Sequence, residues 1–285
     1  MPKLFDKEEL KELYIPSRPS SGEDNGQVTI IGGSKLFHGA PLLSLKVASR
    51  IVDMVYFASP EPSVGRIAEQ IKSKLFSFMW VPWDEVEEYI KKSDSVLIGP
   101  GFMRFGSEKT PEQMRNYNHH EAGRKSRKLT EGFLKSFPNK RWVIDAGSLQ
   151  VIDPELLPKG CVITPNRKEF RLLFKVKQDK KNITQMAKKY NCIINSKGPT
   201  NLVCSPDECV EIKGGNAGLT KGGTGDVLAG LAVALLAKNE PFLAAASASF
   251  IAKAAADELH KKVGTNFNAE DLADNIPGIL QKLSM

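Results

Sequence analysis

The feature that most constrains the fold is the regular alternation of short apolar, β-rich runs with helical patterns. The runs, each followed by a turn-forming sequence, are Gln27–Ile31, Met54–Ala58, Ser95–Ile98, Trp142–Ile144 and Cys161–Thr164. A helix with an apolar period follows the first run, from about residue 40 to residue 52. This alternation is typical of crossover units on a parallel sheet. Ligands of such sheets gather at the carboxyl ends of the strands, so the loops after the runs are the first candidates for a functional site.

The later part of the chain predicts an antiparallel edge and a helical end. Cys192–Ser196 and Asn201–Cys204 are joined by a short Lys-Gly-Pro-Thr connection, which favours an antiparallel pair, and we expect Cys209–Ile212 to extend it. The alanine- or leucine-rich helical patterns that follow are Asp226–Ala237, Phe242–His260 and Ala269–Leu283. We therefore expect an α/β fold with a mainly parallel central sheet, helices on both faces and antiparallel edge strands.

Length and composition fit one globular unit. The 285 residues are fewer than two domains of ~150 residues, and 41% hydrophobic with 26% charged residues is close to the globular average. We expect a single domain over residues 1–285, interrupted by a helical insertion at about residues 102–140. The insertion is rich in charged residues and predicts a solvated helical excursion, with a lid over an anionic ligand as the alternative.

The lengths of the apolar stretches and the cysteine pattern predict where in the cell the protein is found. The longest nearly apolar stretch, Val227–Ala237, is far shorter than the ~20 residues of a membrane span, and residues 1–19 hold no apolar signal segment. We expect a cytoplasmic protein without a membrane partner. None of the cysteines form a C-x-x-C pair, so we expect reduced thiols. The cysteines are Cys161, Cys192, Cys204 and Cys209.

The charge balance favours anionic partners. With 40 basic and 33 acidic residues, the chain carries a net charge of +7, which attracts nucleic acid or phosphate-bearing metabolites. The basic residues of the insertion lack interleaved aromatic side chains on which bases could stack. Nucleic acid is therefore the less favoured partner.

The most informative stretch for function is the glycine-rich run from Gly214 to Asp226, which leads directly into a helical pattern. A glycine-rich turn at a helix start exposes main-chain N–H groups, and the helix dipole adds positive potential, so the run predicts a cradle for a nucleotide phosphate. Asp226 in this cradle is either a helix N-cap, which would contribute ~1 kcal/mol, or a general base acting on a substrate hydroxyl. The run is not a Walker loop, because no Gly-Lys-Ser/Thr follows the glycines.

The motifs around this run resemble a known family. The sequence Gly222-Gly223-Thr224-Gly225-Asp226 resembles the anion-hole signature of ribokinase-like folds, and the longer string from Gly215 to Gly230 resembles the ADP- or ATP-dependent NAD(P)H-hydrate dehydratases. Further segments match the family in order over most of the chain. They are Gly33-Ser34 with Gly39-Ala40, Ile98–Gly101, Val143–Ala146, Ile163–Asn166 with Glu169-Phe170, and Ser196–Gly198.

The resemblance implies a repair reaction, in which a hydrated nicotinamide ring loses water at the expense of a nucleotide phosphate. Asp226 would activate the ring hydroxyl, while the amides of Gly223, Thr224 and Gly225 would form the anion hole for the phosphoryl group. ADP or ATP would donate that group, and Mg²⁺ would neutralise the nucleotide's charge. We assign no metal ligand from the sequence.

The resemblance also implies binding residues and partners. A pocket for the hydrated cofactor would be lined by Ala40, Gly101, Asn166 and Asp226. The adenine nucleotide would contact Lys197, Gly198, Pro199, Thr200, Asn201 and Gly225. A separate epimerase would interconvert the stereoisomers of the hydrate, and we expect a homo-oligomer.

Some residues depart from the family pattern or keep two interpretations. Asn166 stands where many members carry His, so it can hydrogen-bond a ligand but cannot ionise. Lys221 stands at a usually uncharged position, as an extra phosphate cation or a solvated loop lysine. Asp145 would bind Mg²⁺ or a ribose, or close a turn. His38 is given no catalytic role.

Two other functions are open at this point. The same base and cradle could serve an ATP-dependent kinase of a small vitamin-like or sugar alcohol. The cradle could also belong to a nucleotide-binding protein without turnover.

Overall fold

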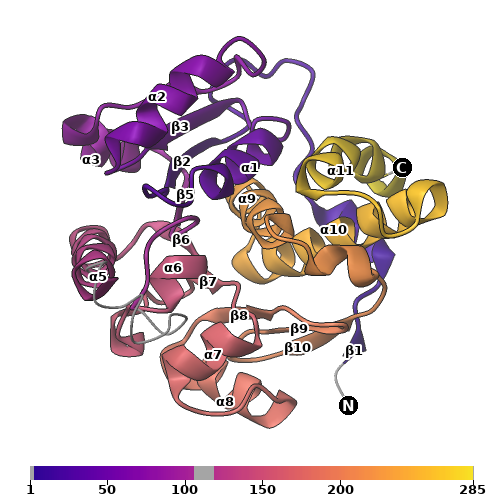
Figure 1. The fold of residues 1–285 in the computed structure, drawn as a ribbon. Coiled ribbons are helices and arrows are strands. Elements are labelled where there is room, and N and C mark those ends of the chain that lie inside the picture. Colours follow the sequence, from indigo (N-terminus) through magenta and orange to yellow (C-terminus); the bar gives the residue numbers. More distant parts are fainter. Residues whose placement is uncertain (1–2, 106–118, 285) are drawn as a thin grey trace.

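The computed structural model describes residues 3–105 and 119–284, which form a central sheet with helices on both faces (Figure 1). Within these ranges the sheet has ten strands in the order β1-β10-β9-β8-β7-β6-β5-β2-β3-β4. The strands are β1 Lys3–Leu4, β2 Gln27–Ile31, β3 Met54–Ala58, β4 Met79–Trp80, β5 Ser95–Ile98, β6 Arg141–Ile144, β7 Val162–Ile163, β8 Ile193–Ser196, β9 Asn201–Cys204 and β10 Cys209–Ile212.

The pairing of the strands confirms the predicted mainly parallel sheet with an antiparallel edge. All neighbours from β4 to β8 are parallel, β9 is antiparallel to both β8 and β10, and β1 is parallel to β10. The predicted runs correspond to β2, β3, β5, β6, β7, β8, β9 and β10. The two-residue strands β1 and β4 were not predicted, whereas the equally short β7 was predicted because it lies within the longer run Cys161–Thr164.

Two layers of helices cover the sheet. The helices are α1 Gly39–Ala48, α2 Pro62–Ile71, α3 Val86–Lys92, α5 His119–Ser136, α6 Ala146–Leu149, α7 Arg167–Phe174, α8 Lys180–Tyr190, α9 Thr224–Leu236, α10 Pro241–Val263 and α11 Ala269–Ser284. Short 3₁₀ turns are η1 Lys7–Glu12, η2 Trp83–Glu85, η3 Pro154–Leu156 and η4 Ala217–Thr220. The 3₁₀ helix η1 near the N-terminus is mostly polar and is capped by Asp6.

The two faces of the sheet bury separate hydrophobic cores. Because side chains alternate along a strand, Leu97 of β5 points into one core, while Val96 and Ile98 point into the other. The first core packs under α1, α2, α9, α10 and α11, and the second packs under α3, α5, α7 and α8. This arrangement confirms the prediction of helices on both faces.

Only part of the predicted insertion lies within the described residues. Residues 106–118 lie outside them, and α5 forms most of the remainder. The side chains of Phe133 and Leu134 on α5 are buried in the second core. This helix is therefore packed on the sheet along one face, rather than solvated all round.

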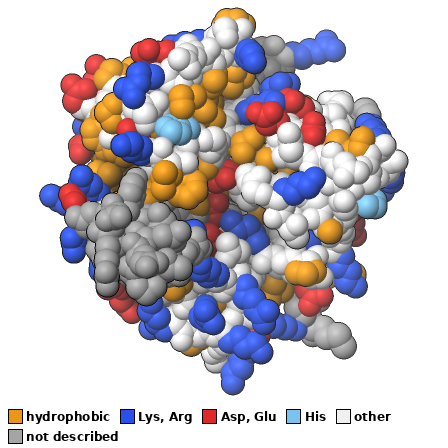
Figure 2. Space-filling model, in the orientation of Figure 1, with side chains coloured by type: hydrophobic (Ala, Val, Ile, Leu, Met, Phe, Trp, Pro, Cys, Tyr) orange, Lys and Arg blue, Asp and Glu red, His pale blue; other side chains and the backbone are white. Residues whose placement is uncertain are grey.

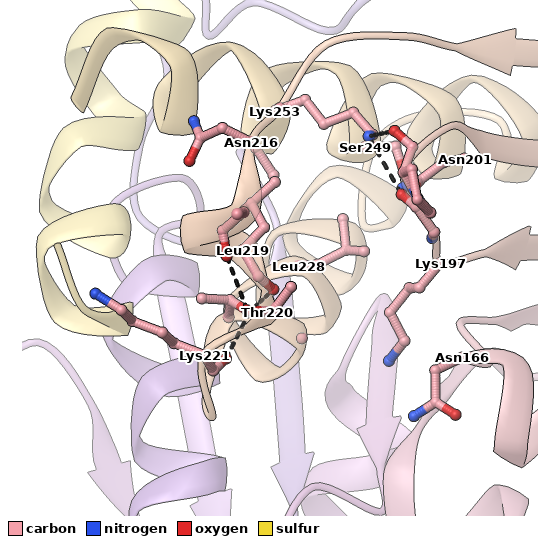
Figure 3. Close-up of a pocket in the computed structure, with 17 residues that line it drawn as sticks. Asn166, Lys197, Asn201, Asn216, Leu219, Thr220, Lys221, Leu228, Ser249 and Lys253 are labelled. Carbon is pink, nitrogen blue, oxygen red and sulfur yellow. Dashed lines mark hydrogen bonds between the residues drawn. The ribbon is translucent and has the colours of Figure 1, made fainter. Parts of the chain in front are cut away.

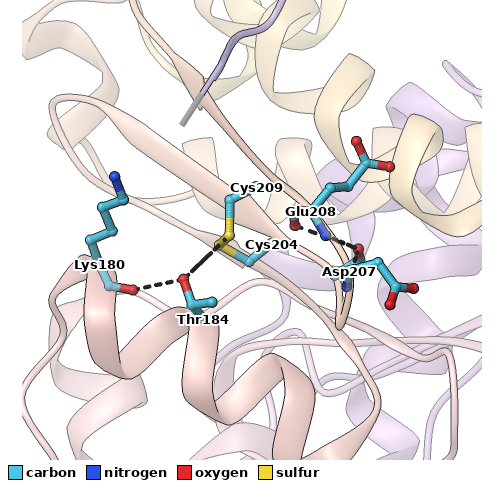
Figure 4. The surroundings of a disulfide bond; sticks show 7 residues. Lys180, Thr184, Cys204, Asp207, Glu208 and Cys209 are labelled. Atoms are coloured by element: carbon cyan, nitrogen blue, oxygen red, sulfur yellow. Dashed lines mark hydrogen bonds between the residues drawn. A yellow bond between two sulfur atoms is a disulfide. The ribbon is translucent and has the colours of Figure 1, made fainter. Parts of the chain in front are cut away.

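The cysteines of the edge hairpin correct the prediction of reduced thiols. Cys204 on β9 and Cys209 on β10 stand directly opposite each other and form a disulfide (Figure 4). The sequence did not indicate this bond, because five residues of separation do not reveal which strand positions face each other. Cys161 and Cys192 are buried and free, as expected.

None of the helices in the described residues is both long enough and apolar enough to cross a bilayer.

Helix α9 is the element that links the core to the edge where the strands end. It is buried along most of its length, and α1 crosses it so closely that a Cβ at Gly230 would lie 2.5 Å from both the Cα and the carbonyl oxygen of Ser44. The Ser44 hydroxyl donates a 2.7 Å hydrogen bond to the carbonyl oxygen of Asp226. The middle of α1 is therefore held against the first two turns of α9.

We expect Gly230→Ala to destabilise the protein, because the added methyl group collides with backbone that cannot rotate away. The free energy of unfolding should fall by about 1–3 kcal/mol, despite the better helix propensity of alanine. Denaturant unfolding measures the change. Gly132→Ala on exposed α5, where a Cβ meets nothing within 4 Å, is the matched control and should be neutral or slightly stabilising. Equal effects of both substitutions would contradict this account of the α1–α9 contact.

Candidate functional site

The glycine-rich run forms the start of α9. Gly223 adopts φ +93°, a left-handed conformation that favours glycine, and a Cβ there would lie 2.5 Å from Leu43 Cδ1. No side chain caps the helix, and the Thr224 N–H donates only a long 3.4 Å hydrogen bond to the carbonyl oxygen of Lys221. The next N–H groups of the first turn are left for a ligand. The Thr224 hydroxyl instead donates to the carbonyl oxygens of Leu219 (2.7 Å) and Lys221 (2.9 Å). Thr224 thus fixes the turn through its side chain.

Four charged side chains converge at the carboxyl edge of the sheet. Asp145 follows β6, Glu169 lies in the first turn of α7, Lys197 follows β8, and Asp226 lies in the first turn of α9. The Lys197 ammonium is 2.8 Å from Asp145 Oδ1 and 3.8 Å from Glu169 Oε2. The carboxylates of Asp145 and Glu169 are both buried. The cluster therefore sets three carboxylates against one ammonium.

Burial shifts the pKa values in this cluster, and so does the excess of three carboxylates over one ammonium. Burial is the main cause that raises the pKa of Asp226 to about 7; the charge of Asp145 acts in the same direction, and the charge of Lys197 opposes it. Burial also raises the pKa of Glu169. Burial acts to lower the pKa of Lys197, but the charges of Asp145 and Glu169 outweigh it and raise that pKa above its usual value. A carboxyl that titrates near neutral pH is suited to general base catalysis.

Asn166 has a structural part in the same cluster. Its side-chain oxygen accepts hydrogen bonds from the N–H groups of Lys168 (2.9 Å) and Glu169 (3.0 Å), and Glu169 Oε2 accepts one from the Asn166 N–H (2.8 Å). This is a capping box at the start of α7. It fixes Glu169 toward Lys197, and asparagine makes such a cap without being ionised.

A cavity of about 700 Å³ opens beside the start of α9 (Figure 3). Its walls come from the β8–β9 loop, residues 215–221, the first turn of α9, and Ser249, Ala252 and Lys253 on α10. This volume is in the range of pockets for small molecules and cofactors. Figure 2 shows the hollow on this face, with acidic and basic side chains next to each other inside it.

The cavity brings together most of the expected nucleotide contacts. It is lined by Lys197, Gly198, Pro199, Asn201 and Gly225, together with Thr224 of the expected anion hole. Thr200 and Gly223 do not line it. Thr200 is exposed in the β8–β9 loop.

The residues expected to bind the hydrated cofactor divide into two groups. Asn166 lines the cavity, whereas Ala40, Gly101 and Asp226 do not. Ala40 lies in the first turn of α1. At Gly101, with φ +75°, a Cβ would lie 2.5 Å from the carbonyl oxygen of Phe37 and 3.1 Å from Pro41 Cδ. Gly101 and Ala40 therefore lie together at the start of α1.

Lys221 is an exposed residue of the glycine-rich run and lines the cavity, and the structure shows a further part for its side chain. Its ammonium donates hydrogen bonds to the carbonyl oxygens of Thr265 and Phe267, in the connection between α10 and α11. Figure 3 shows the side chain pointing away from Lys197. Lys221 thus ties the glycine-rich run to the end of α10.

Sequence reasoning missed Lys253 and Asp257 on α10. Lys253 lines the cavity, and Asp257 accepts a 2.8 Å hydrogen bond from the Gly215 N–H. The signal available was a lysine inside an alanine-rich helix, where a buried charge needs partners. Those partners lie about 40 to 55 residues away along the chain, so the sequence could not name them.

Comparison with known proteins gives a consistent family. A family model described as NAD(P)H-hydrate dehydratase matches residues 28–278. A bifunctional NAD(P)H-hydrate repair enzyme of Methanocaldococcus jannaschii is 34% identical over 283 residues, which are 96% of this chain and 52% of that protein. An ADP-dependent (S)-NAD(P)H-hydrate dehydratase of Nitrosopumilus maritimus is 30% identical over 294 residues, with 95% of each chain covered.

Solved structures confirm the ribokinase-like fold. An ADP/ATP-dependent NAD(P)H-hydrate dehydratase from Bacillus subtilis, co-crystallised with ATP and Mg²⁺, matches with a TM-score of 0.79 at 20% identity, over 99% of both chains. A ribokinase-like superfamily protein from Enterococcus faecalis also matches with a TM-score of 0.79 at 20% identity, over 99% of this chain and 96% of its own.

The raised pKa of Asp226 predicts a cost in stability. Its folded pKa of about 7 lies above the ordinary unfolded value of about 3.9, so the proton stabilises the folded state and this contribution is lost as the pH rises between the two values. Asp226→Asn keeps the group neutral. Its advantage over the wild type in free energy of unfolding should grow by about 1–3 kcal/mol between about pH 5 and about pH 8.

Denaturant unfolding at the two pH values measures this difference. Asp207→Asn removes a carboxylate from an exposed turn and should stay within about 0.5 kcal/mol of the wild type at both pH values. An Asp226→Asn advantage that shrinks as the pH rises would show that the carboxyl is not held in its neutral form.

Proposed function

Because the chain belongs to the NAD(P)H-hydrate dehydratase family, we propose that it dehydrates hydrated NADH or NADPH with a phosphoryl group from an adenine nucleotide. The observation that carries the proposal is Asp226, a carboxyl with a pKa of about 7 at the uncapped start of α9. It stands where a phosphoryl group on the helix N–H groups and a hydroxyl on the carboxylate would meet. The names of the relatives support the same substrate and donor.

The reaction needs the ring hydroxyl to become a leaving group. Asp226 takes the hydroxyl proton while the oxygen attacks the terminal phosphorus of the nucleotide, and the bond from that phosphorus to the bridging oxygen breaks. The lone pair of the ring nitrogen then expels phosphate, and a neighbouring ring carbon loses a proton to restore the double bond. The N–H groups at the start of α9 stabilise the phosphoryl group during transfer.

Lys197 and its partners tune this step. The Lys197 ammonium lies near Gly225, since a Cβ at that residue would be 3.3 Å from Nζ. A cation at this place favours the approach of an anionic phosphate. Asp145 and Glu169 hold the ammonium by ion pairs. They also add the negative potential that keeps the pKa of Asp226 high.

Mg²⁺ fits this site only together with the nucleotide. No group of three or more His, Cys, Asp or Glu side chains among the described residues could hold a metal alone. Asp145 and Glu169 are buried, pair with Lys197 and do not line the cavity, so the nucleotide phosphates would supply the first ligands of Mg²⁺. When bound, the ion would neutralise charge on the phosphates.

The partners are also part of the proposal. The chain spans about half the length of the bifunctional relatives, 52% of one and 50% of another. We propose that an epimerase acting on the hydrate works with this protein as a separate partner. The homo-oligomer and the cytoplasmic location also remain proposals.

The activity test uses hydrated NADH and hydrated NADPH with Mg²⁺ and either ADP or ATP. We expect the absorbance of the dihydronicotinamide to return with at least one nucleotide, because dehydration restores the conjugated ring. Failure with both nucleotides would contradict the proposal. A stable phosphorylated product from a vitamin-like or sugar alcohol would instead indicate the kinase.

Asp226→Asn should lower the rate by about 10²- to 10⁴-fold, the usual contribution of a general base. Nucleotide affinity should stay within a few-fold of the wild type, because the cavity walls do not include this side chain. Steady-state rates and calorimetric titration measure the two effects. Asp207→Asn is the control for loss of a carboxylate at an exposed position. A variant that keeps near wild-type turnover would remove Asp226 from the base role.

A further inference from the structure

Lys253 is a buried cation in the wall of the nucleotide cavity. It lies in the alanine-rich middle of α10 and is 4% exposed. Its ammonium donates hydrogen bonds to the carbonyl oxygens of Pro199 (2.7 Å), Gly214 (2.8 Å) and Gly198 (3.4 Å). An ammonium has three N–H donors, and three carbonyl groups use them. Lys253 is therefore fully engaged by the protein and is not left to bind a phosphate directly.

The three carbonyl groups belong to two separate loops. Gly198 and Pro199 are in the β8–β9 loop, whereas Gly214 lies between β10 and η4. Both loops contribute walls to the cavity. Lys253 is thus a single side chain that bridges the two loops across the end of the β9–β10 hairpin.

Asp257 lies one turn after Lys253 on α10 and hydrogen-bonds the second of these loops. Its carboxylate accepts hydrogen bonds from the Gly215 N–H (2.8 Å) and from Asn216 Nδ2 (3.3 Å). Gly214 and Gly215 adopt φ +86° and +76°. Glycine loses more conformational freedom on ordering than other residues, so two such residues need partners to stay in one conformation.

The buried charge of Lys253 carries a cost that packing does not explain. Burial lowers the pKa of its ammonium, and the charge of Asp257 only partly opposes this shift. An apolar residue would fill the same space in an alanine-rich helix without that cost. What an apolar residue cannot do is hold carbonyl groups of two loops at once.

We propose that Lys253 is a positioning residue for nucleotide binding, which fixes the β8–β9 loop and residues 214–216 in their binding conformation with the help of Asp257. The inference rests on the proposed function, in which this cavity takes the adenine nucleotide. Loops that are ordered before binding do not pay their ordering entropy when the ligand arrives, and this raises affinity. Lys253 acts through the loops and leaves the reacting atoms to other residues.

The experiment compares Lys253→Met, Asp257→Asn and a control on the same helix, Lys261→Met. Lys261 is exposed and pairs with Glu258 at 3.2 Å. Calorimetric titration with ADP and with ATP, each with Mg²⁺, measures affinity, and hydrogen exchange of residues 198–201 and 213–216 measures loop order. Thermal unfolding establishes that each variant is folded.

We expect Lys253→Met to bind both nucleotides about 10- to 100-fold more weakly, as for the loss of hydrogen bonds to a charged group. Amide exchange should become faster in both loops. Asp257→Asn should speed exchange in residues 213–216 only, and Lys261→Met should match the wild type. In turnover, Lys253→Met should raise the KM for nucleotide and leave kcat within about three-fold, a split that a loss of stability alone would not produce.

A folded Lys253→Met protein with wild-type affinity and wild-type loop exchange overturns the inference. If that variant does not fold, Asp257→Asn decides, because unchanged exchange in residues 213–216 would show that α10 does not order this loop. A wild-type protein that binds neither nucleotide overturns the proposed function instead, and the exchange measurements still test whether Lys253 orders the loops.

Discussion

The whole site depends on one ammonium group placed among three carboxylates. The Lys197 ammonium pairs closely with Asp145 and more loosely with Glu169, so these two carboxylates neutralise most of its charge. Burial, together with the charges of Asp145 and Glu169 that Lys197 only partly offsets, raises the pKa of the Asp226 carboxyl to about 7. Each of the four side chains follows a strand or opens a helix, and the four elements are separated along the chain. The cluster can therefore form only when the carboxyl edge of the sheet is complete.

Helix α9 serves the core and the site at once. Its apolar length is buried between the sheet and the neighbouring helices, and this anchors its N-terminal turn in a fixed direction. Gly230 lets α1 approach, and the hydrogen bond from Ser44 to the Asp226 carbonyl holds α1 against the start of α9. Burial and the neighbouring carboxylates, which raise the pKa of Asp226, lower stability at neutral pH, as expected where activity and stability compete.

The sequence predicted the elements that carry a long enough pattern and missed those defined by contacts between distant residues. Eight strands and the long C-terminal helices show clear periods, so the parallel sheet and its antiparallel edge followed from the sequence. The motif near Asp226 located the start of α9. The ion pairs of Lys197, the bonds of Lys253 and the carbonyl partners of Lys221 were not predictable, because each depends on how distant elements pack. The Asn166 cap uses a residue type that favours helix starts, and the sequence could have suggested it.

The cross-link in the edge hairpin has a consequence for how the protein responds to its surroundings. The disulfide joins the first residue pair next to the turn, while the opposite end of the hairpin, where Asn201 faces Ile212, borders the cavity. Two further residue pairs separate the ends, and β9 is also held by β8. Reduction would free a short turn at the rim of the molecule, and the sheet would still hold the opposite end in register. The shape of the cavity therefore does not depend on whether the disulfide is oxidised or reduced.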